Sequence, residues 1–313
     1  MSNSLSPFLL TGALLVALSA TSCAAASEAS PQGTATTAPG GTSAVSTPSA
    51  MPVDEKARGL LPENIRAAGV LRVASDPTYA PFEYFDTDNK TMTGWDVDFT
   101  DAVGATLGLK IEHVPATFDT ILPGLASGKY DMAASFFSVT PEREKIVDFV
   151  QYISSGSGVA VLGGNPQNIT MDPMTMCGKK IAGQKGSIQS MEILPAFSTK
   201  CTEAGQAAID IQNFPSQSDA NLALVSGRVD GVAADSVTLA YQAKEANGKF
   251  ELAKGEDYHP EPIGLALNKN SGLKAAVTEA VRDVLNSDHY QAISEKWGVP
   301  DSVLVSADVL AAK

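Results

Sequence analysis

The sequence predicts an α/β protein with two lobes, each a mixed, mainly parallel sheet flanked by helices. Short β-branched runs that end in polar residues alternate with segments of helical apolar spacing, a pattern typical of parallel sheets. The sequence also contains an internal repeat: LASGKYDMAAS at 125–135 is similar to LVSGRVDGVAAD at 224–235. In each copy a helix stops at glycine, a basic residue follows, and a small-residue strand ends in a polar group. With 313 residues, the chain is long enough for two units that each bury a core.

The elements of the first half follow from these local patterns. PENIRAAG at 62–69 predicts a short helix that stops at glycine, and VLRVASD at 70–76 predicts a strand. Phe99, Val103 and Leu107 have the spacing of one helix face. The remaining expected elements are a strand at 111–116, a helix from 118, a strand that ends at Ser135, and a helix over 140–149.

The second half is expected to repeat this order. Residues 179–197 read as strand, Gly-Ser turn and helix, and residues 219–236 as helix, glycine and strand. A short strand at 263–269 precedes one long helix at 272–298, whose apolar face includes Leu273, Val277, Val281 and Leu285. Trp297 is expected to close that packing.

The first residues are interpreted as a targeting segment followed by a tether. An apolar run at 8–18 is too short to span a bilayer and ends in small residues before Cys23. This predicts a lipoprotein signal peptide at 1–22, with lipid on the Cys23 sulfur; plain secretion is the alternative. Residues 23–56 are rich in Ala, Ser, Thr, Pro and Gly, which predicts a disordered tether. We therefore expect an extracytoplasmic protein held at the cell membrane.

Charge and cysteine content narrow the partners. The formal net charge of −13 disfavours nucleic acid and anionic lipid surfaces, because both need a basic face. An exported chain can keep a disulfide, so Cys177 and Cys201 are expected to be bonded, with two free buried thiols as the alternative. No zinc pattern accompanies them, and neither a metal nor another cofactor is expected.

The segment SFFSVTPER at 135–143 carries the main chemical signal. Thr140 suits a helix N-cap and Pro141 the first helical position, so Arg143 lies in the first turn. A planar guanidinium matches a carboxylate with two parallel hydrogen bonds, and Ser135 and Ser138 supply hydroxyls nearby. A capped surface helix with a solvated arginine is the alternative interpretation.

Other segments supply candidate walls for the same site. Tyr79 lies in a proline-stiffened loop, whereas Phe82 is expected in the core. One of Asp96 and Asp98 should face inward. Gly186 and Ser187 begin a second helix, and Asp235 ends a small-residue strand where it can meet an ammonium group. Ligands of open α/β sheets bind beyond the carboxyl ends of strands, which predicts a site between the lobes.

Five segments taken in order resemble the extracytoplasmic solute-binding proteins for polar amino acids: LRVASDPTYAPFEYFD, GWDVDF, FDTILPGLASGKYD, SVTPER and ISEKWG. The resemblance covers about residues 71–298. It implies the two-lobed periplasmic-binding-protein fold, type II or Venus-flytrap, with two crossing strands. Lobe 1 would comprise 57–155 and 262–313, and lobe 2 would comprise 156–261. It also implies delivery of an amino acid to the permease of an ABC importer that has a separate ATPase.

The resemblance also implies roles for individual residues. Arg143 would bind the α-carboxylate with help from Ser138, from the backbone at Ser135 and Phe136, and from backbone N–H groups near Ile188. Asp235 would bind the α-ammonium. Tyr79 and Phe118 would sandwich the ligand, while Asp76, Asp96 and Gln184 would face its side chain. Trp95, Phe136 and Ile188 stand where the family commonly has Phe, Ser and Thr.

Two other functions remain open at this stage. The same fold serves cyclohexadienyl and arogenate dehydratases, for which Asp76 or Glu83 would be the catalytic carboxylate. An extracellular amino-acid sensor is the second alternative. Binding without catalysis is favoured, because Arg143 and Asp235 together fit a zwitterion. A monomer is expected. The amino acid itself is not identified, although Asp76 and Asp96 lean toward a cationic or amide side chain.

Overall fold

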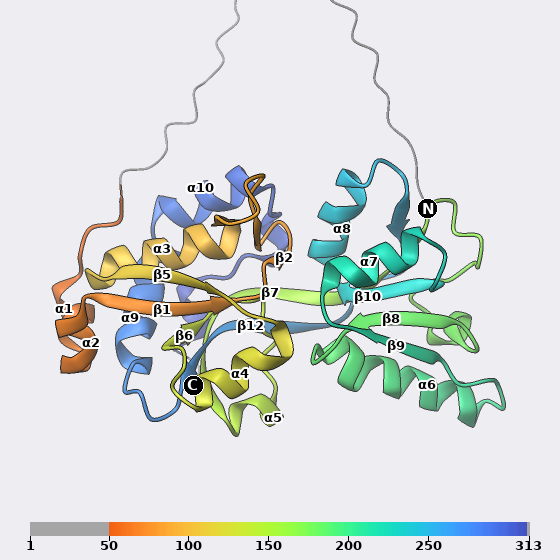
Figure 1. Ribbon diagram of the computed structural model, residues 1–313, viewed down its shortest axis with the longest axis horizontal. Helices are drawn as coiled ribbons and strands as arrows, with labels where there is room; N and C mark the ends of the chain where they lie inside the picture. The colour runs from red at the N-terminus through yellow and green to blue at the C-terminus, as the bar shows by residue number, and fades with distance from the viewer. Residues whose placement is uncertain (1–49, 312–313) are drawn as a thin grey trace, which may run out of the picture. The chain divides into compact units, whose positions relative to one another are not determined.

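The computed structural model describes residues 50–311, which belong to one compact unit. Figure 1 shows two groups of helices and strands connected by the long strands β7 and β12. The strands are β1 (Val70–Ser75), β2 (Thr78–Tyr79), β3 (Glu83–Phe85), β4 (Met92–Thr93), β5 (Lys110–Pro115), β6 (Met132–Ala133), β7 (Val147–Leu162), β8 (Lys180–Gln184), β9 (Asp210–Phe214), β10 (Gly231–Asp235), β11 (Phe250–Leu252) and β12 (Tyr258–Asn268). The α-helices are α1 (Glu55–Gly59), α2 (Glu63–Ala68), α3 (Trp95–Leu107), α4 (Phe118–Ala126), α5 (Pro141–Glu144), α6 (Leu194–Glu203), α7 (Gln217–Val225), α8 (Ser236–Glu245), α9 (Lys274–Leu285) and α10 (Asp288–Trp297).

One sheet runs through both lobes in the order β5-β1-β6-β12-β7-β10-β8-β9, with β11 paired to β7. In the first lobe, β1 is parallel to β5 and β6; in the second, β8 is parallel to β9 and β10. The strands β7 and β12 run antiparallel to each other and carry the chain between the lobes. The expected two-lobed, mainly parallel α/β fold is therefore confirmed.

The predicted lobe boundaries fall within these two crossing strands. Ser155 of β7 is the register partner of Glu261 of β12, and Ser154 pairs with Pro262. The register of the pair shifts twice, between Tyr258 and Glu261 and again between Ile263 and Gly264. Irregular pairing bends strands and increases their twist. The boundaries at 155/156 and 261/262 remain predictions. In the structure they lie opposite each other on the paired strands β7 and β12.

Alternating residues of the sheet build separate cores on its two faces. In the first lobe Val73, Met132 and Leu265 belong to the core that includes α3 and α9, whereas Ala74 and Ala133 belong to the one that includes α4. This alternation is the two-residue period of a strand. The methyl side chains on the second face leave room for the N-terminal end of α4 to lie close to the strand ends.

Three expected elements differ from the structure. The helix predicted at 140–149 is only the short α5, and β7 begins at Val147, where β-branched and aromatic residues pair with β12. The strand expected at 263–269 begins earlier, at Tyr258. The helix expected at 272–298 is two helices, because Ser287 accepts a hydrogen bond from the backbone N–H of His289 and starts α10.

The predicted signal peptide, the lipidation site Cys23 and most of the predicted tether lie outside the described residues. The end of that tether is corrected by the structure, because residues 51–56 belong to the folded part. Met51 is buried, and the side chain of Asp54 accepts a hydrogen bond from the backbone N–H of Lys56 at 2.7 Å, which caps α1. The charged residues 54–56 contain the N-cap of α1, so the folded part begins earlier than the composition of the segment indicates.

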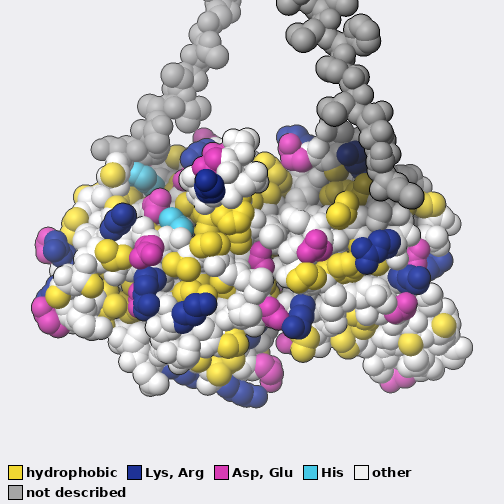
Figure 2. Space-filling view, viewed as in Figure 1, with side chains coloured by type: hydrophobic (Ala, Val, Ile, Leu, Met, Phe, Trp, Pro, Cys, Tyr) yellow, Lys and Arg dark blue, Asp and Glu magenta, His cyan; other side chains and the backbone are white. Residues whose placement is uncertain are grey.

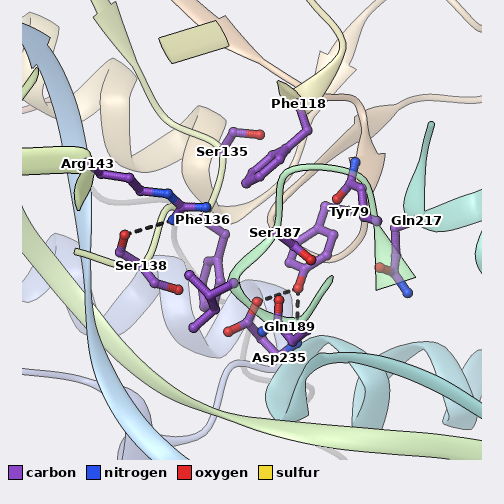
Figure 3. A pocket seen from close by; sticks show the side chains of 12 residues that line it. Tyr79, Phe118, Ser135, Phe136, Ser138, Arg143, Ser187, Gln189, Gln217 and Asp235 are labelled. Carbon is purple, nitrogen blue, oxygen red and sulfur yellow. Dashed lines mark hydrogen bonds between the residues drawn. The ribbon is translucent and has the colours of Figure 1, made fainter. Parts of the chain in front are cut away.

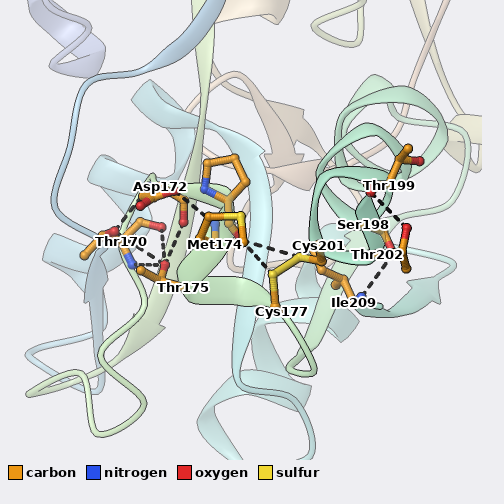
Figure 4. Close-up of a disulfide and its surroundings, with 11 residues drawn as sticks. Thr170, Asp172, Met174, Thr175, Cys177, Ser198, Thr199, Cys201, Thr202 and Ile209 are labelled. Atoms are coloured by element: carbon orange, nitrogen blue, oxygen red, sulfur yellow. Dashed lines mark hydrogen bonds between the residues drawn. A yellow bond between two sulfur atoms is a disulfide. The ribbon is translucent and has the colours of Figure 1, made fainter. Parts of the chain in front are cut away.

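Cys177 and Cys201 form the expected disulfide, with an S–S distance of 2.03 Å (Figure 4). Cys201 lies on α6 and is fully buried. The bond closes a loop with a sequence separation of 24 residues inside the core of the second lobe. It therefore ties α6 to the segment that precedes β8.

On the face shown in Figure 2, Lys and Arg side chains are interspersed with Asp and Glu. Within residues 50–311, none of the helices is long and apolar enough to cross a membrane.

Candidate ligand-binding site

A small cavity lies where strands of both lobes end. Its lining comes from the last residues of β8 and β10, the residues that follow β6, β8 and β9, the β2 hairpin, α5 and the start of α4 (Figure 3). This is the position predicted by the rule for open α/β sheets. The lining residues are Tyr79, Phe118, Ser135, Phe136, Ser138, Arg143, Gln184, Ser187, Ile188, Gln189, Gln217 and Asp235. Nine of the eleven residues expected at the ligand are among them.

Arg143 enters the cavity from α5, which begins as expected: Thr140 caps it and accepts a hydrogen bond from the backbone N–H of Arg143 at 3.3 Å. The guanidinium donates one bond to the carbonyl of Ser138 at 2.8 Å and one to the carbonyl of Gly186 at 3.0 Å. Its Cζ lies 5.4 Å from the ring centre of Phe137. Gly186 is in the left-handed region, with φ of 85°, in the turn that carries this acceptor.

The Arg143 cation faces neutral partners. Its hydrogen-bond acceptors are two carbonyl oxygens, its guanidinium faces the rings of Phe118 and Phe137, and burial lowers the pKa of Arg143 to about 10. A guanidinium has five N–H donors, so donors remain for another acceptor. An anion in the cavity would compensate a buried charge that the fold itself leaves poorly compensated.

Asp235 lies opposite, at the end of β10 and the N-cap position of α8. Its Oδ2 accepts a hydrogen bond from the Tyr79 hydroxyl at 2.5 Å, and its backbone N–H donates to the same hydroxyl at 3.1 Å. Burial raises the pKa of Asp235 to about 6, while the Tyr79 hydrogen bond and the Arg143 charge oppose that rise. The carboxylate is therefore charged at neutral pH and has further lone pairs for a donor.

Asp76 does not line the cavity, which differs from the role that the resemblance implied. Its Oδ2 accepts hydrogen bonds from the backbone N–H of Phe118 at 2.8 Å and from Nε2 of Gln184 at 3.0 Å, and its Oδ1 accepts from the Thr78 hydroxyl at 2.7 Å. The N-terminus of α4 and an amide of the second lobe thus share one carboxylate. Asp76 positions two lining residues, Phe118 and Gln184.

Asp96 also lies outside the cavity lining, in a buried acidic cluster. Its Oδ2 accepts from the Tyr152 hydroxyl at 2.7 Å and from the backbone N–H of Phe136 at 3.3 Å. Glu83 lies in the same cluster, and its Oε1 accepts from the Ser135 hydroxyl at 2.8 Å. Burial raises the pKa of Asp96 to about 7 and that of Glu83 well above its ordinary value.

Asp96 and Asp98 do face in different directions, as expected, but strand-like alternation, which suggested this from the sequence, is not the reason. Both lie in the first turn of α3, not in a strand, and Asp98 bonds to Lys296 and to the indole of Trp297 at 2.7 Å.

Three lining residues were not assigned to the ligand from sequence. Ser187 was noted only as part of a helix start, and its hydroxyl accepts from the backbone N–H of Ser190 at 3.2 Å. Gln189 donates its amide to the Ser157 hydroxyl at 2.9 Å. Gln217 is the first residue of α7, directly after β9. The rule that placed Asp235 beyond a strand end would have found Gln217 as well.

The arrangement suits a small zwitterion. A cation and an anion line one enclosed cavity, Arg143 from the first lobe and Asp235 from the second, with aromatic rings between them. The described residues contain no group of three His, Cys, Asp or Glu side chains that could hold a metal ion. The side chains that line the cavity offer hydrogen bonds and one charge of each sign.

Comparison with known proteins agrees with this geometry. The sequence pattern of the bacterial extracellular solute-binding proteins, family 3, matches residues 71–300. The arginine-binding protein ArgT of Corynebacterium glutamicum is 29% identical over 250 residues, which are 80% of this chain and 81% of that protein. The L-cystine-binding protein TcyJ of Escherichia coli strain K12 is 28% identical over 242 residues, covering 76% of this chain and 86% of the relative.

Solved structures show the same fold. An ancestral arginine-binding protein bound to arginine is 34% identical, with a TM-score of 0.65 over 73% of this chain and 98% of its own. The ancestral amino acid-binding protein AncCDT-1, described as a precursor of cyclohexadienyl dehydratase, is 32% identical, with a TM-score of 0.66 over 75% of this chain and 98% of its own. The chain belongs to the bacterial extracellular solute-binding proteins, family 3.

Proposed function

We propose that this protein binds a polar amino acid outside the cytoplasm and delivers it to the permease of an ABC importer. One observation carries the proposal: a half-buried guanidinium and a buried carboxylate from different lobes line a single cavity. The names of the relatives support it, because those proteins are described as binding arginine or L-cystine.

The ligand would be held by its two charged ends. Arg143 would bind the α-carboxylate with bonds from donors that are free of Ser138 and Gly186, and Asp235 would accept from the α-ammonium. Tyr79 and Phe118 would cover the ligand from the first lobe. A zwitterion is costly to bury alone, and opposite charges at both ends offset that cost.

Closure of the lobes would be coupled to binding. Several bonds already join the lobes in this structure: Tyr79 to Asp235, Gln184 to Asp76, and Lys185 to Asp119 at 2.7 Å. A ligand that bonds to both lobes favours the closed arrangement by its difference in affinity for the closed and open forms. The permease would then recognise the closed form.

The finer features are part of the same proposal. Cys23 would carry the lipid, residues 24–50 would form the tether, and the protein would act as a monomer whose importer uses a separate ATPase. Delivery to a membrane permease is compatible with a binding protein held at the membrane surface.

A dehydratase of the same fold is the alternative. It needs a carboxylate at the reacting atoms, and the only acid among the described residues that line the cavity is Asp235, which bonds to Tyr79. Glu83, the other residue considered for that role, bonds to Ser135 in the buried cluster. The geometry favours binding without turnover.

The test is a thermal-shift and calorimetric screen of the full chain, after exhaustive dialysis, against the twenty amino acids. A ligand that binds only the native state adds about 4 kcal/mol at a thousand times its Kd. We expect at least one polar amino acid to stabilise the protein, while its decarboxylated amine and its α-keto acid do not. Stabilisation by none of the twenty, together with turnover of prephenate or arogenate, would replace the proposal with the enzyme.

A further inference from the structure

The acidic cluster and the cavity are separated by one layer of residues. Ser135 lines the cavity and donates its hydroxyl to Glu83, and Phe136 lines the cavity and donates its backbone N–H to Asp96. Glu83 and Asp96 are at most 1% exposed. A ligand in the cavity is therefore next to two carboxyl groups that it does not reach.

The ring of Phe136 lies between the cavity and the carboxyl groups of Glu83 and Asp96. Its centre lies 4.0 Å from the ring centre of Phe82 and 5.9 Å from that of Tyr79. Phe136 has φ of 50°, in the left-handed region that a bulky residue rarely occupies, and its bond to Asp96 holds it there. The backbone is thus fixed in a conformation in which the Phe136 ring fills the space between the hairpin aromatics.

The carboxyl pair behind this ring has an incomplete set of partners. Glu83 Oε2 and Asp96 Oδ1 accept no hydrogen bond from any other group among the described residues, so the contact that is left to them is the bond between the two carboxyls when one of them carries a proton. The named bonds of the pair come from Ser135, Tyr152 and Phe136, all of them neutral donors. Burial raises the pKa of both acids, so the pair retains a proton near neutral pH and carries at most one negative charge, which the Phe136 ring separates from the cavity.

The charges that do line the cavity are matched by the backbone ends of an amino acid. Arg143 and Asp235 would be used by the α-carboxylate and the α-ammonium, and the other polar lining residues are neutral: Ser135, Ser138, Gln184, Ser187, Gln189 and Gln217. A cationic ligand side chain would be desolvated without an anion, and an anionic side chain without a cation. A neutral hydrogen-bonding side chain would find amide and hydroxyl partners.

We propose that Phe136 determines specificity, by closing the cavity against the Glu83–Asp96 pair so that the protein selects amino acids with neutral, hydrogen-bonding side chains over arginine and lysine. This inference rests on the proposed function, since it names the substrate class of the same site. It also separates this chain from the relatives whose names specify arginine.

The experiment compares the full chain with Phe136→Ser by calorimetry at pH 8, using L-glutamine, L-asparagine, L-serine, L-threonine, L-arginine, L-lysine and L-glutamate. We expect a neutral member of this set to bind the unaltered protein at least tenfold more tightly than arginine, lysine or glutamate. Phe136→Ser should raise the affinity for arginine relative to that neutral ligand at least tenfold. Adding Asp96→Asn to Phe136→Ser should abolish the gain, because it removes the charge that the opened cavity would present.

The outcomes are distinguishable. Binding of arginine or lysine by the unaltered protein as tightly as any neutral amino acid would overturn the inference and leave the proposed function intact. A gain that persists in Phe136→Ser with Asp96→Asn would overturn it too, because the acid pair would then not be the source. Binding of no amino acid by the unaltered protein would remove the proposed function itself. If Phe136→Ser does not fold, Phe136→Ala is measured in its place with the same expected results, and the unaltered protein still tests the preference for neutral side chains.

Discussion

Replacing Arg143 by methionine should remove binding while leaving the ligand-free protein nearly as stable. Methionine has a similar length and can pack on the rings of Phe118 and Phe137, which Arg143 now faces. The ligand carboxylate would then be buried without its counter-charge. Removing one member of a buried ion pair costs roughly 3–5 kcal/mol, which weakens affinity by about two to three and a half orders of magnitude.

The stability of the ligand-free protein should respond differently, because two effects of Arg143 nearly cancel there. Its pKa of about 10, against an ordinary value of 12.5, corresponds to roughly 3 kcal/mol of unfavourable charge burial. The bonds to the carbonyls of Ser138 and Gly186 contribute about 1 kcal/mol each in the opposite direction. The melting temperature of ligand-free Arg143→Met should therefore stay within a few degrees of that of the unaltered protein.

Calorimetry with the ligand from the screen measures the affinity, and scanning calorimetry without ligand measures the stability. Arg228→Met is the matched control, because Arg228 is exposed and also lies over an aromatic ring, that of Phe214 at 5.6 Å, away from the cavity. It should bind normally. Retention of affinity within threefold by Arg143→Met would refute the assignment of the carboxylate site. A large fall in the ligand-free melting temperature would show instead that Arg143 mainly supports the fold.

Three further changes test the site and its support. Because the pKa of Asp235 is raised to about 6, the carboxylate that accepts the ammonium is lost as pH falls through that value, and affinity should drop about tenfold per pH unit below 6. Asp235→Asn should bind weakly at every pH, without this dependence. Titration calorimetry from pH 4.5 to 8 would detect the difference. Replacing Cys177 and Cys201 by serine should cost roughly 3 kcal/mol, from the entropy of the loop they close, with unchanged affinity, because both lie outside the cavity lining; a loss of affinity would contradict that separation. Since burial raises the pKa of Asp96 to about 7, its contribution to stability is present at low pH and lost as pH rises through 7; the ligand-free melting temperature should fall less between pH 5 and 8 in Asp96→Asn, and an unchanged slope would argue against the buried acid.

Much of the fold could be predicted because its elements carry local signals. Glycine stops, Ser and Thr caps and alternating apolar patterns located most helices and strands, and the echo between 125–135 and 224–235 indicated two similar lobes. The longest strand, β7, was not predicted. Its centre, SSGSG, has low β-propensity, and pairing with β12 and β11 on one side and with β10 on the other provides what the local sequence lacks.

The site was partly predictable for a similar reason. Arg143 follows a Thr-Pro helix start, which fixes its place locally, and Asp235 follows a strand of small residues. Asp76 and Asp96 were expected to face the ligand because an acid near a binding loop is an obvious partner for one. Their actual partners are the backbone N–H of Phe118 and the hydroxyl of Tyr152, which are 42 and 56 residues away in sequence. Only the tertiary structure shows that these acids are already occupied.

In the two copies of the repeated segment, the residues that stabilise the fold are alike and the residues that end in the cavity differ. In the first, Asp131 accepts a hydrogen bond from the backbone N–H of Arg72 at 2.9 Å; in the second, Asp230 accepts one from the backbone N–H of Lys180 at 2.8 Å. Aspartates at corresponding positions of the repeat thus bond to the neighbouring parallel strand in each lobe, β1 in the first and β8 in the second. At the other end of the repeated segments the copies differ: the first ends at the neutral Ser135, whose hydroxyl bonds to a buried acid, and the second ends at the carboxylate of Asp235, although both residues line the cavity. The strand-fixing aspartate thus occurs in both copies, whereas the charged residue at the cavity, Asp235, occurs only in the second. The first lobe can therefore supply a cation, Arg143, and the second an anion to a ligand that carries both charges.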